Sequence, residues 1–286
     1  MKFGLIGDPI SHSQSPELFR RAYNGKYCYD LIEGKYFEES YSKFLKGYEA
    51  INVTAPFKEA AYEKADVVSG PAALIGAANI LVKGEDGISC HNSDFTGIIL
   101  CVAEALFPGI TVEFYGEFGE RAHIKIHQFT RDRIKTLEER PKALIVSCGG
   151  AGKAAAVAAA ELGYEVWILN RSIEKAEKFV KGLPEYGFRT GGLDDFKERL
   201  RISDLVIYTA PAALDCIPEL ERDDFKPGQI FLEANYKNPS FKGLTLARMM
   251  DARVRYIPGR MWLVNQAISG YALMTGEAPD VKSLLF

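Results

Sequence analysis

A glycine-rich turn between a buried strand and an alanine-rich helix constrains the fold of this chain more than any other feature. The apolar run 143–147 predicts a strand, and Lys153–Leu162 predicts a helix that Gly163 ends. Between them lies the turn Cys148-Gly149-Gly150-Ala151-Gly152. A further strand is predicted over Glu165–Leu169. This order is a complete βαβ unit, so we expect an α/β fold with a parallel sheet.

The turn has the composition of a dinucleotide site. Small residues let the backbone approach a pyrophosphate, and the N-terminus of the following helix supplies N–H groups. Gly149, Gly150 and Ala151 are the candidate contacts. The G-x-G-x-x-G spacing is incomplete because Ser147 occupies the first glycine position. By itself, the turn is therefore equally typical of a plain tight turn.

The end of the next strand bears on which nucleotide could bind. Asn170-Arg171-Ser172 follows Leu169, where an acidic residue would bind the 2′-hydroxyl of NAD. Arg171 and Lys175 instead suit a 2′-phosphate, so the sequence predicts NADP. The alternative is that both cations only decorate a helix start, where cations are disfavoured unless an anion is bound.

The first hundred residues also alternate between strand and helix patterns. Ser15, before Pro16, is expected to cap a helix over 17–23, and Asp94 to cap a helix that starts near Phe95. The remaining expected elements are strands over 2–7, 27–32 and 50–54, helices over 36–45 and 59–65, and a hairpin of 78–82 with 87–90.

Beyond the glycine-rich unit, the alternation continues. We expect helices over 173–180, 193–200 and 261–275, the last ending at Gly276, and strands over 187–189, 204–208, 229–233 and 254–256. Residues 111–140 form a charge-rich insert that contains Gly116 and Gly119 and a helical run over 131–139. We expect this insert to be a solvated excursion, with an interface element as the alternative.

Composition excludes several classes of protein. The net charge of −3 comes without a lysine/arginine block, which argues against nucleic acid or an anionic membrane as a partner. The five cysteines are scattered without a C-x-x-C pair, and the four histidines form no metal-binding pattern. No apolar run is long enough for a signal peptide or a membrane span. We therefore expect a cytoplasmic protein with reduced thiols and no metal.

The segment 52–58 raises a different possibility. A β-branched strand end is stopped by Pro56, Phe57 can bury its ring, and Lys58 follows where ligands bind in open α/β sheets. A shielded lysine can exchange protons with a small substrate. Taken alone, the segment favours the alternative of a solvated lysine that opens the next helix.

Short motifs in one consistent order resemble the shikimate dehydrogenase family, over nearly all of the chain outside 111–140. In this sequence they read S-H-S-Q-S-P (11–16), N-V-T-A-P-F-K (52–58), G-A-A-N (76–79), N-S-D-F-T-G (92–97), N-R-S (170–172), E-A-N-Y-K-N-P (233–239) and G-R-M-W-L-V-N-Q-A (259–267). The chain departs from the family pattern at Ser147, and at Tyr208, where an asparagine is common.

The resemblance implies two domains and a reaction. Residues 1–98 with 259–286 would form the substrate domain, and 99–258 a Rossmann-like NADP domain that contains the insert, with the active site in the cleft. The reaction would be reversible hydride transfer between NADPH and C3 of 3-dehydroshikimate, giving shikimate in the chorismate and aromatic amino-acid pathway. The resemblance also implies a cofactor contact at Gly259, besides those at Asn170, Arg171, Ser172 and Lys175. The protein could be a monomer or a homodimer.

The side chains in these motifs match that substrate. Lys58 and Asp94 would form the acid/base pair, in which charged Lys58 bonds the ketone oxygen and donates its proton. Hydroxyl donors to the carboxylate are Ser11, Ser13 and Tyr236, and partners for the ring hydroxyls are Thr54, Asn79 and Gln266. The alternatives are loop-capping serines, a packed tyrosine, and backbone bonding by the two amides. We treat His12 as a loop residue.

Two other functions stay open at this stage. One is a quinate/shikimate dehydrogenase that uses NAD, against which the Arg171/Lys175 pair argues. The other is a non-catalytic nucleotide-binding regulator with the same fold, against which the presence of both Lys58 and Asp94 argues. The departures at Ser147 and Tyr208 concern cofactor affinity and preference, and neither changes a substrate residue.

Overall fold

The computed structural model describes residues 1–113 and 122–285, so Gly116 and Gly119 of the expected insert lie outside the described residues. The chain divides into two compact units. Unit 1 contains Met1–Gly97 and the residues from Val264 onward, and unit 2 contains the described residues between Ile98 and Leu263. The α/β fold class is confirmed, with a six-stranded sheet in each unit.

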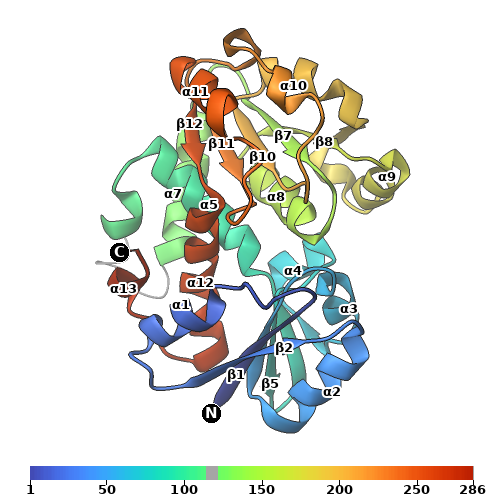
Figure 1. The fold of residues 1–286 in the computed structure, drawn as a ribbon, viewed down its shortest axis with the longest axis vertical. Helices are drawn as coiled ribbons and strands as arrows, with labels where there is room; N and C mark the ends of the chain where they lie inside the picture. Colours follow the sequence, from blue (N-terminus) through green and yellow to red (C-terminus); the bar gives the residue numbers. More distant parts are fainter. Residues whose placement is uncertain (114–121, 286) are drawn as a thin grey trace. The chain divides into compact units, whose positions relative to one another are not determined.

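The sheet of unit 1 is mixed, with strand order β2-β1-β3-β5-β6-β4. Figure 1 labels its strands β1, β2 and β5. β1 lies parallel to β2 and β3, whereas β5 runs antiparallel to both β3 and β6, which confirms the expected hairpin. The sequence reasoning missed the short edge strand β4. The strands are β1 (Lys2–Gly7), β2 (Cys28–Glu33), β3 (Ala50–Val53), β4 (Val67–Val68), β5 (Ile80–Gly84) and β6 (Gly87–His91).

In two helices of this unit, the residue expected as the N-cap lies inside the helix. α1 begins at Ser15, because the Leu18 N–H already bonds the Gln14 carbonyl; Gln14 is therefore the N-cap, and the prediction for Ser15 is wrong. α5 begins at Ser93, so Asp94 lies inside the first turn instead of capping it. The helices that start in this unit are α1 (Ser15–Ala22), α2 (Phe37–Gly47), α3 (Lys58–Glu63), α4 (Gly70–Ile75), α5 (Ser93–Leu106) and α13 (Val281–Leu285).

The sheet of unit 2 is fully parallel, with strand order β12-β11-β10-β7-β8-β9. The order reverses between β7 and β10, and in such doubly wound sheets ligands bind at the carboxyl ends beside this reversal. The strands are β7 (Lys142–Val146), β8 (Glu165–Leu169), β9 (Arg189–Gly191), β10 (Leu205–Tyr208), β11 (Ile230–Glu233) and β12 (Arg255–Ile257).

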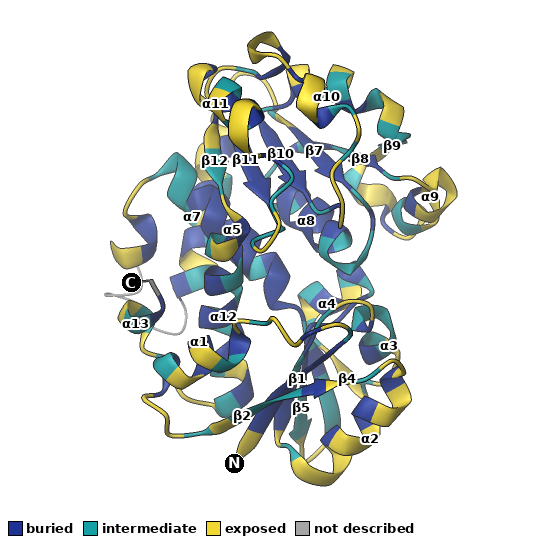
Figure 2. Ribbon diagram, in the orientation of Figure 1, coloured by how far each residue is buried: buried dark blue, intermediate teal, exposed yellow. Residues whose placement is uncertain are grey.

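The helices of unit 2 include an almost fully buried one. The alanine-rich α8 buries every residue from Ala154 to Ala160, since small side chains let a helix lie close to a sheet (Figure 2). The helices are α7 (Ala122–Lys135), α8 (Gly150–Glu161), α9 (Ile173–Lys181), α10 (Phe196–Ile202) and α11 (Gly243–Asp251), with 3-10 turns η2 (Pro184–Tyr186), η3 (Leu193–Asp195), η4 (Ile217–Glu219) and η5 (Arg222–Asp224). α12 (Gly259–Thr275) starts here and continues into unit 1.

The described part of the insert corrects the expectation of a solvated excursion. Its charges hide an apolar face, because Ala122, Ile126, Thr130 and Ile134 recur every four residues of α7 and are all buried. Ile126 joins a core cluster with residues of α5, and Phe129 meets Phe107 edge to face at 5.2 Å. The helix also ends at Lys135, earlier than the expected 139. This stretch is therefore a packed element of unit 2.

Candidate active site

The segment 52–58, which contains Lys58, adopts the expected local structure. β3 ends at Val53, a short turn follows, and Lys58 is the first residue of α3. Phe57 is buried and packs against Phe37, with ring centroids 5.7 Å apart. This anchor fixes the start of α3, and the Lys58 side chain is only 14% exposed. A solvated surface lysine is therefore the wrong description of Lys58.

Lys58 and Asp94 form a buried ion pair in unit 1. Nζ of Lys58 lies 2.5 Å from Oδ2 of Asp94, whose side chain is 7% exposed. Asp94 sits in the first turn of α5, where the helix dipole favours an anion. Asn92 Oδ1 accepts the Phe95 N–H at 3.4 Å, at the helix start where Asp94 was expected to act. The pair thus holds an ammonium group whose proton has a defined direction.

The two amides predicted to bind ring hydroxyls meet each other within unit 1. Asn79 precedes β5 and Gln266 lies on α12, and Asn79 Nδ2 donates to Gln266 Oε1 at 2.9 Å. The same Nδ2 donates to Ser93 Oγ at 3.0 Å, while the Ser93 N–H donates to Asn79 Oδ1 at 2.8 Å. This bond uses Gln266 Oε1 as an acceptor, and the substrate roles of the two amides stay predictions.

Ser93 is a residue that the sequence reasoning did not single out. Its N–H and hydroxyl fix the orientation of the Asn79 amide, and a Cβ on Gly270 of α12 would come within 2.9 Å of its Oγ. The available signal was its place in the motif 92–97, directly before Asp94. Packing against α12 could not be inferred from that motif.

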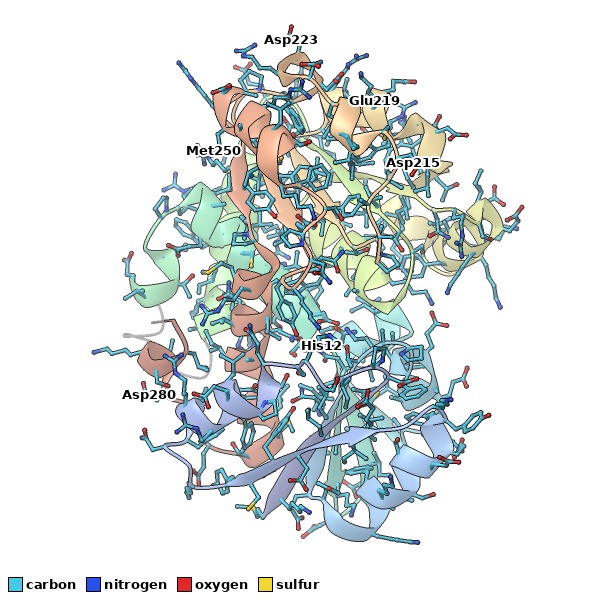
Figure 3. All side chains as sticks on the ribbon, in the orientation of Figure 1. His12, Asp215, Glu219, Asp223, Met250 and Asp280 are labelled. Carbon is cyan, nitrogen blue, oxygen red and sulfur yellow. The ribbon has the colours of Figure 1, made fainter. Side chains whose placement is uncertain are left out.

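The remaining predicted substrate residues of unit 1 are less constrained. Ser11 is exposed, as is His12, which lies on the polar loop before α1 (Figure 3). Ser13 Oγ accepts the Ser15 N–H at 3.2 Å and bonds Ser15 Oγ at 3.1 Å, so it takes part in loop bonding. Thr54 bonds through its backbone to Ile6, and its side chain is half-buried. Their substrate roles stay predictions.

The glycine-rich turn of unit 2 enters α8 earlier than predicted. Gly149 is the N-cap and Gly150 the first helical residue, so Gly150, Ala151 and Gly152 form the first turn. The N–H groups of a first turn have no partner within the helix and can bind an anion. A Cβ at Gly152 would lie 2.0 Å from the Ser147 carbonyl oxygen, so this position requires glycine. The geometry suits a phosphate-binding turn.

Ser147, the first departure from the family pattern, keeps the conformation of a glycine. Its φ is +86°, in the left-handed region that residues with a Cβ rarely adopt. Its N–H bonds the Leu169 carbonyl at 2.7 Å, which holds the turn against β8. The substitution therefore leaves the turn in place at the cost of backbone strain.

The loop after β8 combines a structural asparagine with exposed polar residues. Asn170 Oδ1 accepts the Cys148 N–H at 2.9 Å, and its Nδ2 donates to the Ser172 carbonyl at 2.8 Å. Ser172 Oγ donates to Glu174 at 3.0 Å. Arg171 and Lys175 are both exposed, as an arginine and a lysine that recognise a phosphate at the surface would be. Their roles, and that of Ser172, remain predictions.

The environment of Tyr208, the second departure from the family pattern, argues against a role as a cofactor ligand. It is fully buried, its hydroxyl donates to the Ala212 carbonyl at 2.7 Å, and it accepts the Leu214 N–H at 3.2 Å. Burial raises the pKa of Tyr208 to about 12, so the hydroxyl stays protonated. Tyr208 thereby shapes the segment 209–214 that follows β10.

Gly259 and Tyr236 belong to the carboxyl side of β11. Gly259 opens α12, and a Cβ there would lie 2.3 Å from the Ala234 carbonyl oxygen, so glycine permits close packing on the end of β11. Tyr236 is half-buried in the segment after β11. The predicted cofactor and substrate roles of these two residues are not tested by this geometry.

A doubly wound parallel sheet whose glycine-rich turn lies at the strand-order reversal is typical of the class of dinucleotide-binding proteins. The profile of the shikimate dehydrogenase substrate-binding domain matches residues 5–81, and the profile of shikimate/quinate 5-dehydrogenase matches residues 130–225. The chain belongs to the shikimate dehydrogenase family.

A curated relative agrees with this assignment, and solved structures share the fold. The shikimate dehydrogenase (NADP(+)) of Maricaulis maris is 28% identical over 99% of this chain and 94% of its own length. Shikimate 5-dehydrogenase from Thermus thermophilus, in complex with NADP(H) and shikimate, superposes with a TM-score of 0.75 at 22% identity, over 99% of this chain and 97% of that one. Quinate dehydrogenase from Corynebacterium glutamicum, in complex with NAD, gives 0.77 at 18% identity, over 99% and 96%.

None of the helices described in this chain combines the length and apolar composition that a membrane crossing requires.

Proposed function

We propose that this chain is an NADP-dependent shikimate dehydrogenase that reversibly reduces 3-dehydroshikimate to shikimate, in chorismate and aromatic amino-acid biosynthesis. The observation that carries the proposal is the buried Lys58–Asp94 pair in a chain of this family. A lysine at the surface is solvated by water and does not require a buried partner, whereas Lys58 pairs with Asp94, whose side chain is only 7% exposed.

The proton chemistry follows from that pair. NADPH, when bound, supplies the hydride that reduces the ketone. Lys58 bonds the ketone oxygen and donates a proton as negative charge develops on that oxygen. Asp94 fixes the direction of the Lys58 Nζ through their ion pair. In the reverse direction, neutral Lys58 accepts the proton from the C3 hydroxyl.

Substrate recognition rests on the amide cluster of unit 1. Asn79 and Ser93 hold Gln266 Oε1 as an acceptor, so Gln266 Nε2 is oriented to donate to a ring hydroxyl. Thr54 adds a hydroxyl, and Ser11, Ser13 and Tyr236 are proposed to bind the carboxylate. A ring without hydroxyl groups would leave these polar groups unpaired, which favours a polyhydroxylated acid.

The cofactor is proposed to bind through its pyrophosphate to the first turn of α8. Gly149, Gly150 and Ala151 lie there, and the glycine required at 152 keeps the turn tight. Arg171 and Lys175 would take the 2′-phosphate of NADP, with Asn170 and Ser172 shaping their loop. Gly259 is kept as a proposed contact.

The proposal also covers the oligomeric state and the cellular location, which depend less directly on the site. All five cysteines are free thiols, which suits a cytoplasmic location. A monomer or a homodimer would serve the chemistry equally, since every residue named above comes from one chain.

The test is the initial rate of the purified protein with shikimate and with quinate, each against NADP and NAD. We expect turnover with shikimate and NADP to exceed every other combination at least tenfold. A faster rate with quinate and NAD would instead support a quinate/shikimate dehydrogenase that uses NAD. The quinate dehydrogenase of Corynebacterium glutamicum shares the fold of this chain. No turnover with any combination would leave a non-catalytic nucleotide-binding protein.

A further inference from the structure

Glu233 is a completely buried acid that the proposed chemistry does not use. It is the last residue of β11 and has 0% exposure. A buried carboxylate is costly unless hydrogen-bond donors replace its water. The interactions of its two oxygens therefore show what this acid stabilises.

The donors to Glu233 come from two places in unit 2. Its Oε1 accepts the backbone N–H of Ser240, and its Oε2 accepts the N–H of Phe241 at 3.3 Å. Tyr256 on β12 donates its hydroxyl to the same Oε2 at 2.6 Å. Burial, and then the bond to Glu233, raises the pKa of Tyr256, so the phenol stays a donor.

These bonds close the chain segment that carries Tyr236. The segment leaves β11 after Glu233 and returns at Ser240 and Phe241 to bond the side chain of the residue where it began. Asn235 Nδ2 bonds the Ala210 carbonyl at 2.9 Å, which ties the segment to the loop after β10. The Ala234 carbonyl also lies against Gly259. Tyr236 thus sits on a loop held at its base.

We propose that Glu233 is a positioning residue for substrate binding: its carboxylate anchors the loop 234–241 and so sets the place of the Tyr236 phenol. This inference rests on the proposed function, in which that phenol donates to the substrate carboxylate. Glu233 touches neither substrate nor cofactor and acts only through the loop.

Glu233→Gln is the informative substitution, because it keeps the shape and replaces one acceptor oxygen by an NH₂ group that faces an N–H donor. We expect the KM for shikimate to rise about fivefold, while kcat and the KM for NADP change less than twofold. Tyr256→Phe removes one donor from the same carboxylate and should give a smaller change of the same kind, should Glu233→Gln fail to fold.

Asp224→Asn is the matched control. Asp224 is also a buried acid of unit 2, with 2% exposure, but its partners are the Glu221 N–H, Arg201 and Lys197. Its replacement should lower thermal stability and leave the KM for shikimate unchanged. An equal rise in KM for both variants would overturn the proposal, because it would mark a general loss of stability.

Two further measurements separate this inference from the proposed function. In a Tyr236→Phe background, Glu233→Gln should raise the KM for shikimate by less than twofold; full additivity would contradict action through Tyr236. Without any substrate, Glu233→Gln should speed amide hydrogen exchange at Ser240 and Phe241 at least tenfold. Unchanged exchange there overturns the anchor, whereas absent turnover in the wild-type protein overturns the proposed function alone.

Discussion

Nζ of Lys58 and Oδ2 of Asp94 lie 2.5 Å apart, on the first turns of α3 and α5. Each residue lies at the start of a helix that follows a strand of the same sheet, so the sheet sets their separation. Asp94→Asn should keep the shape of the side chain and remove the carboxylate that fixes the direction of the Lys58 Nζ. We expect kcat for shikimate oxidation to fall about 10²-fold. Steady-state kinetics check this, and an unchanged kcat would refute a role for Asp94 in proton transfer.

The amide cluster predicts a selective effect on substrate affinity. Ser93→Ala removes the hydroxyl that accepts a hydrogen bond from Asn79 Nδ2, so the amide and Gln266 lose their fixed orientation. The KM for shikimate should rise about tenfold, with the KM for NADP unchanged. Ser89→Ala is the matched control, since Ser89 bonds the Val82 carbonyl and His91 on the hairpin. Equal effects of the two variants would sink the prediction.

Cofactor choice should depend on the exposed cations after β8. Arg171→Ala removes one charge proposed to bind the 2′-phosphate and should raise the KM for NADP about tenfold, with little change for NAD. Lys181→Ala, in the last turn of α9, tests for a general effect of surface charge. If Arg171→Ala weakens NAD and NADP equally, the 2′-phosphate contact is wrong.

Backbone strain at Ser147 predicts a stabilising substitution. Ser147→Gly relieves the φ of +86° and should raise the free energy of unfolding by about 1 kcal/mol, after allowance for the entropy that glycine loses. Urea unfolding measures this change. Ser147→Ala is the control: it removes the hydroxyl and keeps the strain, so it should not stabilise. A gain with alanine equal to that with glycine would locate the effect in the hydroxyl.

The stability of unit 1 should fall in mild acid because of His91. Burial lowers the pKa of His91 below its ordinary value of 6.5, so the unfolded chain binds the proton first as the pH drops. The contribution of neutral His91 to stability is therefore present at pH values above 6.5, and it decreases as the pH falls below 6.5. His91→Gln should flatten thermal stability against pH in that range, and match the wild-type slope near pH 8. Parallel curves throughout would contradict this assignment.

Local patterns predicted the strands other than β4, and most helices, because both the period and the turn residues were present. The glycine-rich βαβ unit is the clearest case. Patterns did not predict α4 and α11. In α11 the buried residues are Thr245 and Met249, and the polar threonine weakens the periodic signal. α4 begins with a Gly-Pro pair, which is typical of a loop. The charges of α7 concealed its buried face in the same way.

The residues of the candidate site could be proposed from the sequence, but the hydrogen bonds between them could not. Motifs named Asn79 and Gln266, but their direct bond joins positions 187 residues apart, which no local pattern encodes. The sequence showed that Ser147 replaces a glycine, whereas its positive φ is a property of the folded turn. Glu233 was quoted only as part of a motif, since its burial depends on the neighbouring strands.

The central claim is that Lys58 transfers the proton in NADP-linked oxidation of shikimate, and one paired measurement tests it. Turnover and the binding of shikimate by calorimetry are compared in wild-type protein and in Lys58→Ala. We predict that kcat falls at least 10³-fold while the dissociation constant for shikimate changes less than tenfold. Substantial turnover by Lys58→Ala, within tenfold of wild type, would contradict the account.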